Sequence, residues 1–317
     1  MGDKCEVFLE KEEYAPGEII NGRVECNFAS QNKVKGIRLK ISGDAKVFWK
    51  ISAFTYRRAQ EVFFETDLDL LETDEMTFPP GTYTYPFTYT LPSTVPSSMM
   101  EGDPTYKKTV ASYVVPFNLV DVYYGCVQYI IKVTIERSWS TNISIEKLFK
   151  VMSSLDLTTI SGLEKSYELS IGKRPSSLFK DTGPITATIQ MPRSGYVPGE
   201  KLPFSVYVKN ASSIDIQYIQ FKFVQGFVFH AEQSTKSIDT MMGEEFMLKE
   251  SDVAVGNERS WKLELVVPSM FLGNYSHCSV IKNFWELRGE ICLPFPNPAF
   301  NVSVPITVGS VALTKRP

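Results

Sequence analysis

The sequence predicts an all-β protein made of two tandem β-sandwich domains. Most of its 317 residues fall in short runs of alternating apolar and polar residues, which is the period of a strand with one buried face. One stretch is also written twice: EYAPGEIING begins at Glu13, and GYVPGEKLPF begins at Gly195. A self-match at a fixed offset indicates two copies of one structural unit.

The repeat predicts the same turn in both copies. Tyr196 follows Tyr14 by 182 positions (196 − 14), and apolar residues coincide at the same spacing further along, as Val206 does with Val24. Pro presets φ for the second position of a type II turn, and Gly supplies the positive φ of the third. We therefore expect structural roles for these motif residues: Tyr14, Pro16, Gly17, Glu18, Gly22, Tyr196, Pro198, Gly199 and Glu200.

The other elements are also predicted to be strands. In TYTYPFTYTL, residues 82–91, aromatic residues alternate with threonines, which is typical of a half-buried strand. Pro86 has no N–H to donate, so it predicts an edge position or a bulge. Helix signals are nearly absent, and the one ambiguous segment, IEKLFKVMSSL from Ile145, is predicted as a strand. Further alternating segments begin at Gly36, Tyr129, Ile219 and Trp261.

The border between the domains is expected between the two copies. A chain of 317 residues suits two domains of roughly 150 residues each. The stretch from Ser161 to Pro184 is polar and contains Pro175. The sequence therefore predicts a first sandwich over 1–160, a linker over 161–183 and a second sandwich over 184–317.

Composition indicates a cytoplasmic protein. The net charge of −3 gives no electrostatic reason to expect nucleic acid as a partner. No apolar run approaches the length of a transmembrane segment, and the start, MGDKCEVFLEKEE, lacks the apolar core of a signal peptide. Five cysteines without a CxxC spacing suit reduced, buried thiols. Four N-glycosylation sequons, at Asn142, Asn210, Asn274 and Asn301, favour the opposite compartment.

The sequence predicts no enzyme, no cofactor and no metal site. It has two histidines, His230 and His277, without the Ser or Asp pattern of a triad. Cys278 follows His277, but neighbouring residues of a strand point to opposite faces, so a Cys–His dyad is not expected. Cys278 is expected to be an inert buried thiol rather than a redox partner. HExxH, EF-hand and GxG patterns are missing.

Two kinds of charged segment are candidate binding sites. The acidic run ETDLDLLETDE, residues 65–75, suits calcium in principle, and a solvated strand edge is the favoured interpretation. Two basic doublets are candidates for partner binding because phosphates and acidic lipid head groups attract them. Solvated faces are the alternative explanation. The doublets are Arg57 with Arg58 and Lys107 with Lys108.

Several motifs together resemble the arrestin family, and its α-arrestin (arrestin-domain-containing) branch in particular. Tyr14 opens the pattern Tyr-x-Pro-Gly-Glu-x-Ile-x-Gly-x-Val. Later stretches that resemble the family are GTYTYPFTYTLPSTVPSSMMEG from Gly81, FKVMSSLDLTTISGL from Phe149 and VPITVGSVAL from Val304. The resemblance covers almost the whole chain in the expected order. It implies the arrestin fold, with two immunoglobulin-like β-sandwich domains.

The resemblance implies a non-enzymatic cytosolic adaptor. Such a protein binds cytoplasmic segments of membrane receptors or transporters and directs endocytosis, ubiquitin-linked sorting or protein transport. It is recruited to the plasma membrane or endosomes without a transmembrane segment. HECT-type ubiquitin ligases are implied partners, but the PPxY motif that docks them is not seen, and PPGTY, residues 79–83, is the nearest match. The alternatives are a stable arrestin-like subunit of an endosomal coat and an extracellular adhesion sandwich.

Overall fold

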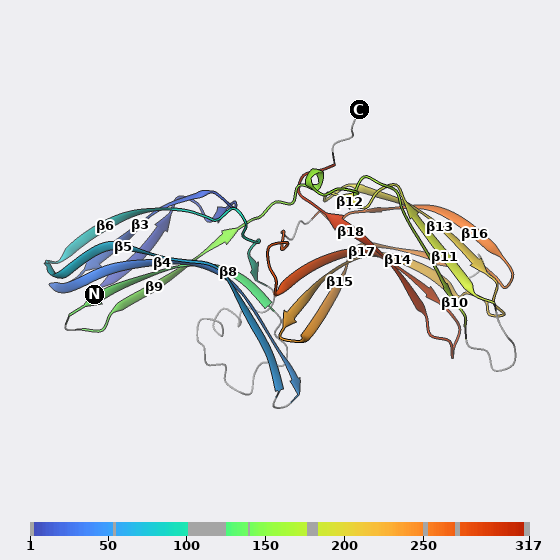
Figure 1. Cartoon of the computed structure of the whole chain (residues 1–317), viewed down its shortest axis with the longest axis horizontal. Helices are drawn as coiled ribbons and strands as arrows, with labels where there is room; N and C mark the ends of the chain where they lie inside the picture. Colours follow the sequence, from blue (N-terminus) through green and yellow to red (C-terminus); the bar gives the residue numbers. More distant parts are fainter. Residues whose placement is uncertain are drawn as a thin grey trace. The chain divides into compact units, whose positions relative to one another are not determined.

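The computed structural model describes residues 3–52, 55–100, 125–138, 140–175, 183–249, 253–269 and 273–313. It divides into two compact units (Figure 1). The first contains Met1–Ser153 together with two later segments, Phe229–Lys236 and Gly273–Lys282. The second contains Ser154–Val228, Ser237–Leu272 and Asn283–Pro317. Both units consist of β-sheets in which most neighbouring strands are antiparallel, which confirms the predicted all-β class.

The first unit is a sandwich of two sheets. In the smaller sheet the strand order is β1-β3-β6, with β1 at Lys4–Leu9, β3 at Ile19–Phe28 and β6 at Gly81–Thr90. In the larger sheet it is β2-β9-β8-β4-β5, and the short β7 (Met99–Met100) pairs with β8. The bounds in the larger sheet are Glu13–Tyr14 for β2, Ile143–Val151 for β9, Gly125–Arg137 for β8, Asn32–Ser52 for β4 and Thr55–Phe78 for β5.

The second unit repeats this plan. Its smaller sheet has the order β10-β11-β13-β16, and its larger sheet has the order β12-β18-β17-β14-β15. The smaller sheet contains β10 (Tyr167–Lys173), β11 (Ile185–Met191), β13 (Lys201–Asn210) and β16 (Glu258–Val266). The larger contains β12 (Gly195–Tyr196), β18 (Phe300–Val308), β17 (Ile281–Cys292), β14 (Tyr218–Ala231) and β15 (Ser234–Lys249). The ends of β14, β15 and β17 that fall within 229–236 and 281–282 belong to the first unit.

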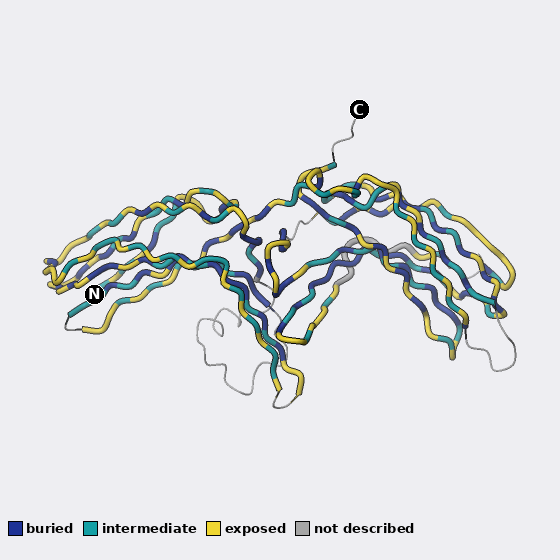
Figure 2. Tube along the Cα trace, in the orientation of Figure 1, coloured by how far each residue is buried: buried dark blue, intermediate teal, exposed yellow. Residues whose placement is uncertain are grey.

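Alternating burial along the strands builds the two cores (Figure 2). On β8, for example, Ile131, Val133 and Ile135 face inward, and Lys132 between them is exposed. In the second unit Ile189, Val206 and other apolar residues of both sheets form one buried cluster. Each fully buried aliphatic side chain stabilises its sandwich by about 1.5–3 kcal/mol, so the strand period decides the fold.

Two expectations about single strands are confirmed. The segment from Ile145 lies in β9, and Pro86 lies on β6 at the edge of its sheet. On β6, Phe87 is buried and the threonines that alternate with the aromatic residues are exposed. The aromatic face therefore lies toward the core, as the alternation predicts.

The stretch predicted as a linker, 161–183, contains the strand β10 (Tyr167–Lys173). β10 pairs with β11 over its whole length and is the edge strand of its sheet. Tyr167, Leu169 and Ile171 pack partly buried against the core, whereas Glu168 and Ser170 between them face solvent. The solvent-facing residues of this edge strand are polar. Because they make the whole stretch polar in composition, the sequence predicts a linker here.

Candidate binding surface

Both copies of the repeated motif form the predicted type II turn. The N–H of Glu18 donates to the carbonyl of Ala15 at 3.1 Å, and the N–H of Glu200 donates to that of Val197 at 3.1 Å. Gly17 has a φ of 79° and Gly199 has a φ of 78°, a region open to glycine at no steric cost. The Pro-Gly pairs, Pro16 with Gly17 and Pro198 with Gly199, thus reverse the chain identically in the two units.

The glutamate that follows each Pro-Gly pair closes its turn from the side chain. Each carboxylate accepts a backbone hydrogen bond and pairs with a cation that lies before the buried tyrosine of the motif. Pairing with Lys11 also holds the pKa of the Glu18 carboxyl below its usual range. In the first copy, Glu18 accepts the N–H of Ala15 at 2.8 Å and pairs with Lys11, whose ammonium lies over the Tyr14 ring. In the second copy, Glu200 accepts the N–H of Val197 at 3.1 Å and pairs with Arg193, whose guanidinium lies over the Tyr196 ring.

Gly22 permits close packing rather than a turn. A Cβ at this position would lie 2.5 Å from the ring of Phe87 and 2.8 Å from the carbonyl oxygen of Phe8. A side chain here would therefore push apart β1, β3 and β6. The motif residues of the first copy thus act on the local shape of the sandwich.

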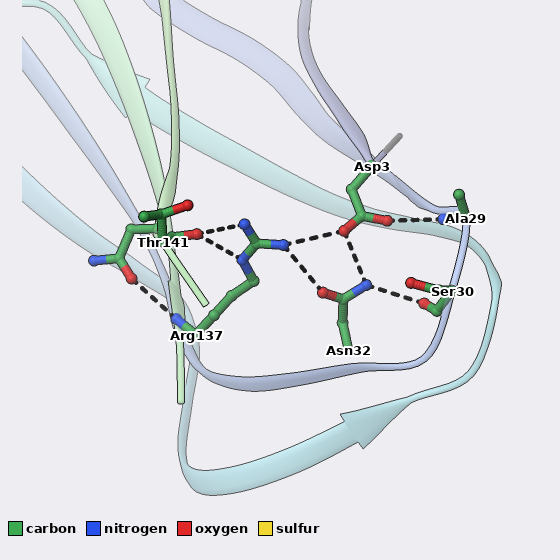
Figure 3. A network of polar contacts seen from close by, with 7 residues as sticks. Asp3, Ala29, Ser30, Asn32, Arg137 and Thr141 are labelled. Atoms are coloured by element: carbon green, nitrogen blue, oxygen red, sulfur yellow. Dashed lines mark hydrogen bonds and ion pairs between the residues drawn. The ribbon is translucent and has the colours of Figure 1, made fainter. Parts of the chain in front are cut away.

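A polar network fastens the start of the chain to the first sandwich (Figure 3). The guanidinium of Arg137, at the end of β8, donates to the Asp3 carboxylate at 3.1 Å and to the Asn32 side chain at 3.2 Å. It also donates to the carbonyl of Thr141. The Asp3 and Arg137 side chains are each 14% exposed, so water screens their attraction only in part. This network joins segments that lie 134 positions apart.

β5 is the edge strand of the larger sheet in the first unit. It pairs with β4, and no other strand in the described ranges pairs with it. Register shifts interrupt the pairing near Gly43/Asp44 and near Ile37/Arg38. Between these shifts, Phe64–Asp69 pairs regularly with Arg38–Gly43. We call the side of Phe64–Asp69 that faces away from β4 the β5 edge. Its backbone N–H and C=O groups can pair with an added strand.

Three carboxylates line the outer face of the β5 edge. Glu65, Asp67 and Asp69 alternate along the strand and are exposed. Lys40 pairs with Glu65 at 2.6 Å, and Arg38 pairs with Asp69 at 3.4 Å. Arg38 also lies 3.5 Å from Glu136, so these carboxylates outnumber the cations beside them. Where the chain is described, no group of three or more His, Cys, Asp or Glu side chains could hold a metal ion.

Of the predicted basic doublets, the structure describes the first. Arg57 is half-buried, and its guanidinium lies 3.7 Å from the carboxylate of Glu232. Arg58 is exposed, because successive residues of a strand point to opposite faces. The two arginines therefore do not form one patch. Lys107 and Lys108 lie outside the described residues.

Segments from later in the chain contact the start of β5. The carboxylate of Glu61 accepts hydrogen bonds from the N–H of Ser279 at 2.6 Å, from its hydroxyl at 2.9 Å and from the N–H of Val280 at 3.4 Å. With the Arg57–Glu232 pair, these contacts engage β5 around Arg57 and Glu61. The β5 edge lies beyond them.

The neighbours His277 and Cys278 lie in a turn, whereas the sequence predicts a strand. Asn274 accepts the N–H of Ser276 through its side chain at 3.0 Å, and this local bond favours a turn. His277 is exposed, whereas Cys278 is buried. Burial raises the pKa of the Cys278 thiol to about 12, which suits an inert thiol better than a nucleophile.

Two other thiols, those of Cys5 and Cys26, form a contact that the sequence does not predict. Cys5 on β1 lies directly opposite Cys26 on β3, and their sulfur atoms are 3.2 Å apart. The Cys26 thiol holds the pKa of Cys5 below its ordinary value, and Cys5 together with burial raises the pKa of Cys26. Both are free thiols.

Comparison with known proteins places both sandwiches in one family. Residues 5–158 match the N-terminal domain of arrestin (or S-antigen), and residues 181–313 match its C-terminal domain. Arrestin domain-containing protein 1 of Rattus norvegicus is 24% identical over 96% of this chain and 63% of its own length. Arrestin domain-containing protein 17 of Caenorhabditis elegans is 22% identical over 98% of this chain and 71% of its own.

A third relative, arrestin domain-containing protein 4 of Mus musculus, is 23% identical over 94% of this chain and 69% of its own length. The chain thus spans less than two thirds of the rat relative. Among the described residues, no helix is long and apolar enough to cross a membrane. The two domain matches follow one another along most of the chain, in the order that the resemblance implies. The chain therefore belongs to the arrestin family, within its arrestin-domain-containing, or α-arrestin, branch.

Proposed function

We propose that this chain is a non-enzymatic adaptor that binds extended cytoplasmic segments of membrane proteins at the β5 edge. The observation that carries the proposal is the open, regular stretch from Phe64 to Asp69 at the rim of a large sheet. An extended peptide can add a strand to such an edge, gaining backbone hydrogen bonds over its length. Family membership supports an adaptor rather than an enzyme.

Charge favours a basic partner segment. A strand added to the β5 edge places every second side chain beside Glu65, Asp67 or Asp69. Opposite charges in such cross-strand positions contribute roughly 0.2–1 kcal/mol each. Cytoplasmic segments close to a membrane carry an excess of Lys and Arg, so they complement this face.

The finer role that we propose is sorting of the bound protein. In this proposal the adaptor is cytoplasmic, is recruited to the plasma membrane or endosomes by its cargo, and directs that cargo to endocytosis or ubiquitin-linked transport. HECT-type ubiquitin ligases are the proposed partners for this step, and the 317 residues contain no PPxY motif. Arg58, exposed on the same strand, is a proposed additional contact for acidic groups of cargo or lipid.

Peptide binding tests the proposal. The probes are fluorescent peptides of basic juxtamembrane sequence from plasma-membrane transporters, with a matched set in which Glu replaces Lys and Arg. The triple variant Glu65→Gln, Asp67→Asn, Asp69→Asn removes the three charges and keeps the side-chain shapes. We expect it to weaken binding of the basic peptides about tenfold in fluorescence anisotropy. The wild-type affinity should also fall as salt is added.

The matched control lies on another edge strand. Glu258→Gln with Glu264→Gln removes two exposed carboxylates of β16, which pair with Lys209 and Lys201 across the strands as Glu65 does with Lys40. This variant should bind as the wild type does. Equal binding by the triple variant, or equal binding of the acidic peptides, would contradict the proposed surface.

A further inference from the structure

Cys5 and Cys26 stand out because they are two free thiols that lie directly opposite each other in the first sandwich. β1 and β3 run antiparallel, and these two residues are partners in the ladder. We propose that the pair is a peroxide-oxidisable site that closes to an intramolecular disulfide and joins β1 covalently to β3. The inference does not depend on the proposed adaptor function.

The ladder positions the two residues for a disulfide. Directly opposite residues of an antiparallel pair have Cα atoms about 4.5–5.5 Å apart. A disulfide accepts Cα separations of about 4.4–6.8 Å, so the backbone needs no large movement. The sulfur atoms already lie 3.2 Å apart, and small rotations of the two side chains complete the approach.

Exposure gives the two thiols different roles. Cys5 is half-buried, so a small oxidant reaches it from solvent, whereas Cys26 is fully buried beneath it. The neighbouring Cys26 thiol also holds the pKa of Cys5 below its ordinary value, which favours the reactive thiolate. The remaining cysteines, Cys126, Cys278 and Cys292, are buried.

The chemistry balances with a hydroperoxide as the oxidant. The Cys5 thiolate attacks one oxygen of hydrogen peroxide, the O–O bond breaks, and hydroxide leaves and takes a proton to become water. Cys5 is then a sulfenic acid. The sulfur of Cys26 attacks the Cys5 sulfur, the S–O bond breaks, and the second water leaves with the proton of Cys26. Two thiols are oxidised to one disulfide, and the peroxide is reduced to two waters.

The disulfide would secure an edge strand. β1 lies at the edge of its sheet, and among the described strands it pairs with β3 alone. Without the bond, hydrogen bonds and packing hold it against β3. With the bond formed, local opening of β1 near Cys5 is restricted, and its backbone amides should exchange with solvent more slowly.

Thiol mapping on the purified, reduced full-length chain tests the proposal. After brief treatment with hydrogen peroxide, the chain is unfolded in denaturant, its free thiols are blocked with N-ethylmaleimide, and the digest is analysed by mass spectrometry without reduction. We expect peptides containing Cys5 and Cys26 to appear cross-linked, two hydrogen atoms lighter than their sum. The other three of the five cysteines should be alkylated. Dithiothreitol added after the peroxide and before the block should leave all five thiols open to alkylation.

Two variants keep the test decisive. In Cys26→Ser the resolving thiol is gone, so Cys5 should accumulate as a sulfenic acid that a 1,3-dione probe labels. Cys278→Ser, a buried thiol elsewhere in the same unit, should leave the cross-link unchanged. Circular dichroism establishes that both variants fold. Retention of all five thiols in the treated wild type, or a cross-link between other cysteines, would overturn the proposal.

Discussion

Glu200 in the second sandwich occupies the position that Glu18 occupies in the first: each carboxylate caps its own Pro-Gly turn and pairs with a cation seven positions upstream. The cations share the repeat as well, since Arg193 follows Lys11 by 182 positions (193 − 11). The duplication thus preserves the carboxylate–cation pair beside each turn in addition to the backbone turn itself. Its role is structural in both units, which makes it a sensitive probe of each.

The repeated turn predicts matched effects of alanine. Gly17→Ala and Gly199→Ala should each lower the free energy of unfolding of their own unit by about 1–2 kcal/mol, because alanine is strained at positive φ. Space is not the cause, since the nearest atom to a Cβ at Gly17 would be 3.8 Å away. Urea denaturation followed by circular dichroism measures the loss. Asparagine at the same positions should cost less, and an equal cost would contradict this explanation.

The first sandwich should depend on residues from later in the chain. Phe229 is fully buried in the first unit, where a Cβ on Gly125 would come within 2.8 Å of its ring. Phe229→Ala should therefore destabilise that unit by about 3–5 kcal/mol in thermal or urea unfolding. Phe295→Ala is the control, because Phe295 is 97% exposed, and it should change stability by less than about 0.5 kcal/mol.

A fragment ending at residue 183 gives the complementary test. It lacks Phe229–Lys236 and Gly273–Lys282, which belong to the first unit. We expect it to bind a hydrophobic dye and to unfold at lower urea than the same unit in the full chain. Equal stability of fragment and full chain would show that these segments are dispensable.

The largely buried ion pair between Arg137 and Asp3 should contribute more to the free energy of unfolding than an exposed ion pair does. Arg137→Ala leaves the Asp3 carboxylate, 14% exposed, without its cation and should cost about 2 kcal/mol. Lys132→Ala removes a pair with Glu146 whose members are 47% and 48% exposed, and it should cost less than about 1 kcal/mol. Hydrogen exchange at β1 should rise in the first variant alone. Equal effects would mean that the network does not hold the start of the chain.

The Cys5–Cys26 contact predicts an unusual pH dependence of alkylation. The thiolate reacts with iodoacetamide, and the pKa of Cys5 lies below its ordinary value. Its reaction should therefore reach half of its maximal rate at a lower pH than that of a free cysteine. Cys26→Ala removes the neighbouring thiol and should move this midpoint upward. Cys278, whose pKa is raised to about 12, should stay unreactive until the chain unfolds, and an unchanged Cys5 midpoint would contradict the assignment.

The strand period and the repeat made most of the fold predictable. Alternation identified strands such as β6 and β9, and Pro-Gly identified both turns, because these features depend on residues close in the chain. β10 was missed because one side of an edge strand is solvated. The later segments that complete the first unit were missed because their contacts, such as Ser279 with Glu61, span 218 positions.

The candidate site was less predictable because it depends on register. The acidic run from Glu65 was visible, but its pairing with Lys40 and Arg38 follows from the alignment of β4 with β5. The Cys5–Cys26 pair carried a weak signal: the two positions are symmetric about the Ala15–Pro16 bond, ten residues on each side (15 − 5; 26 − 16). A hairpin folded about that turn brings them together.

Affinity capture from gently solubilised membranes, quantified by mass spectrometry, tests the central claim most directly. The bait is the tagged full chain, compared with the Glu65→Gln, Asp67→Asn, Asp69→Asn variant and with the Glu258→Gln, Glu264→Gln control. The account predicts that wild type and control recover the same plasma-membrane receptors or transporters and that the triple variant loses them. One stoichiometric coat complex recovered by all three baits, with no membrane-protein cargo, would contradict it.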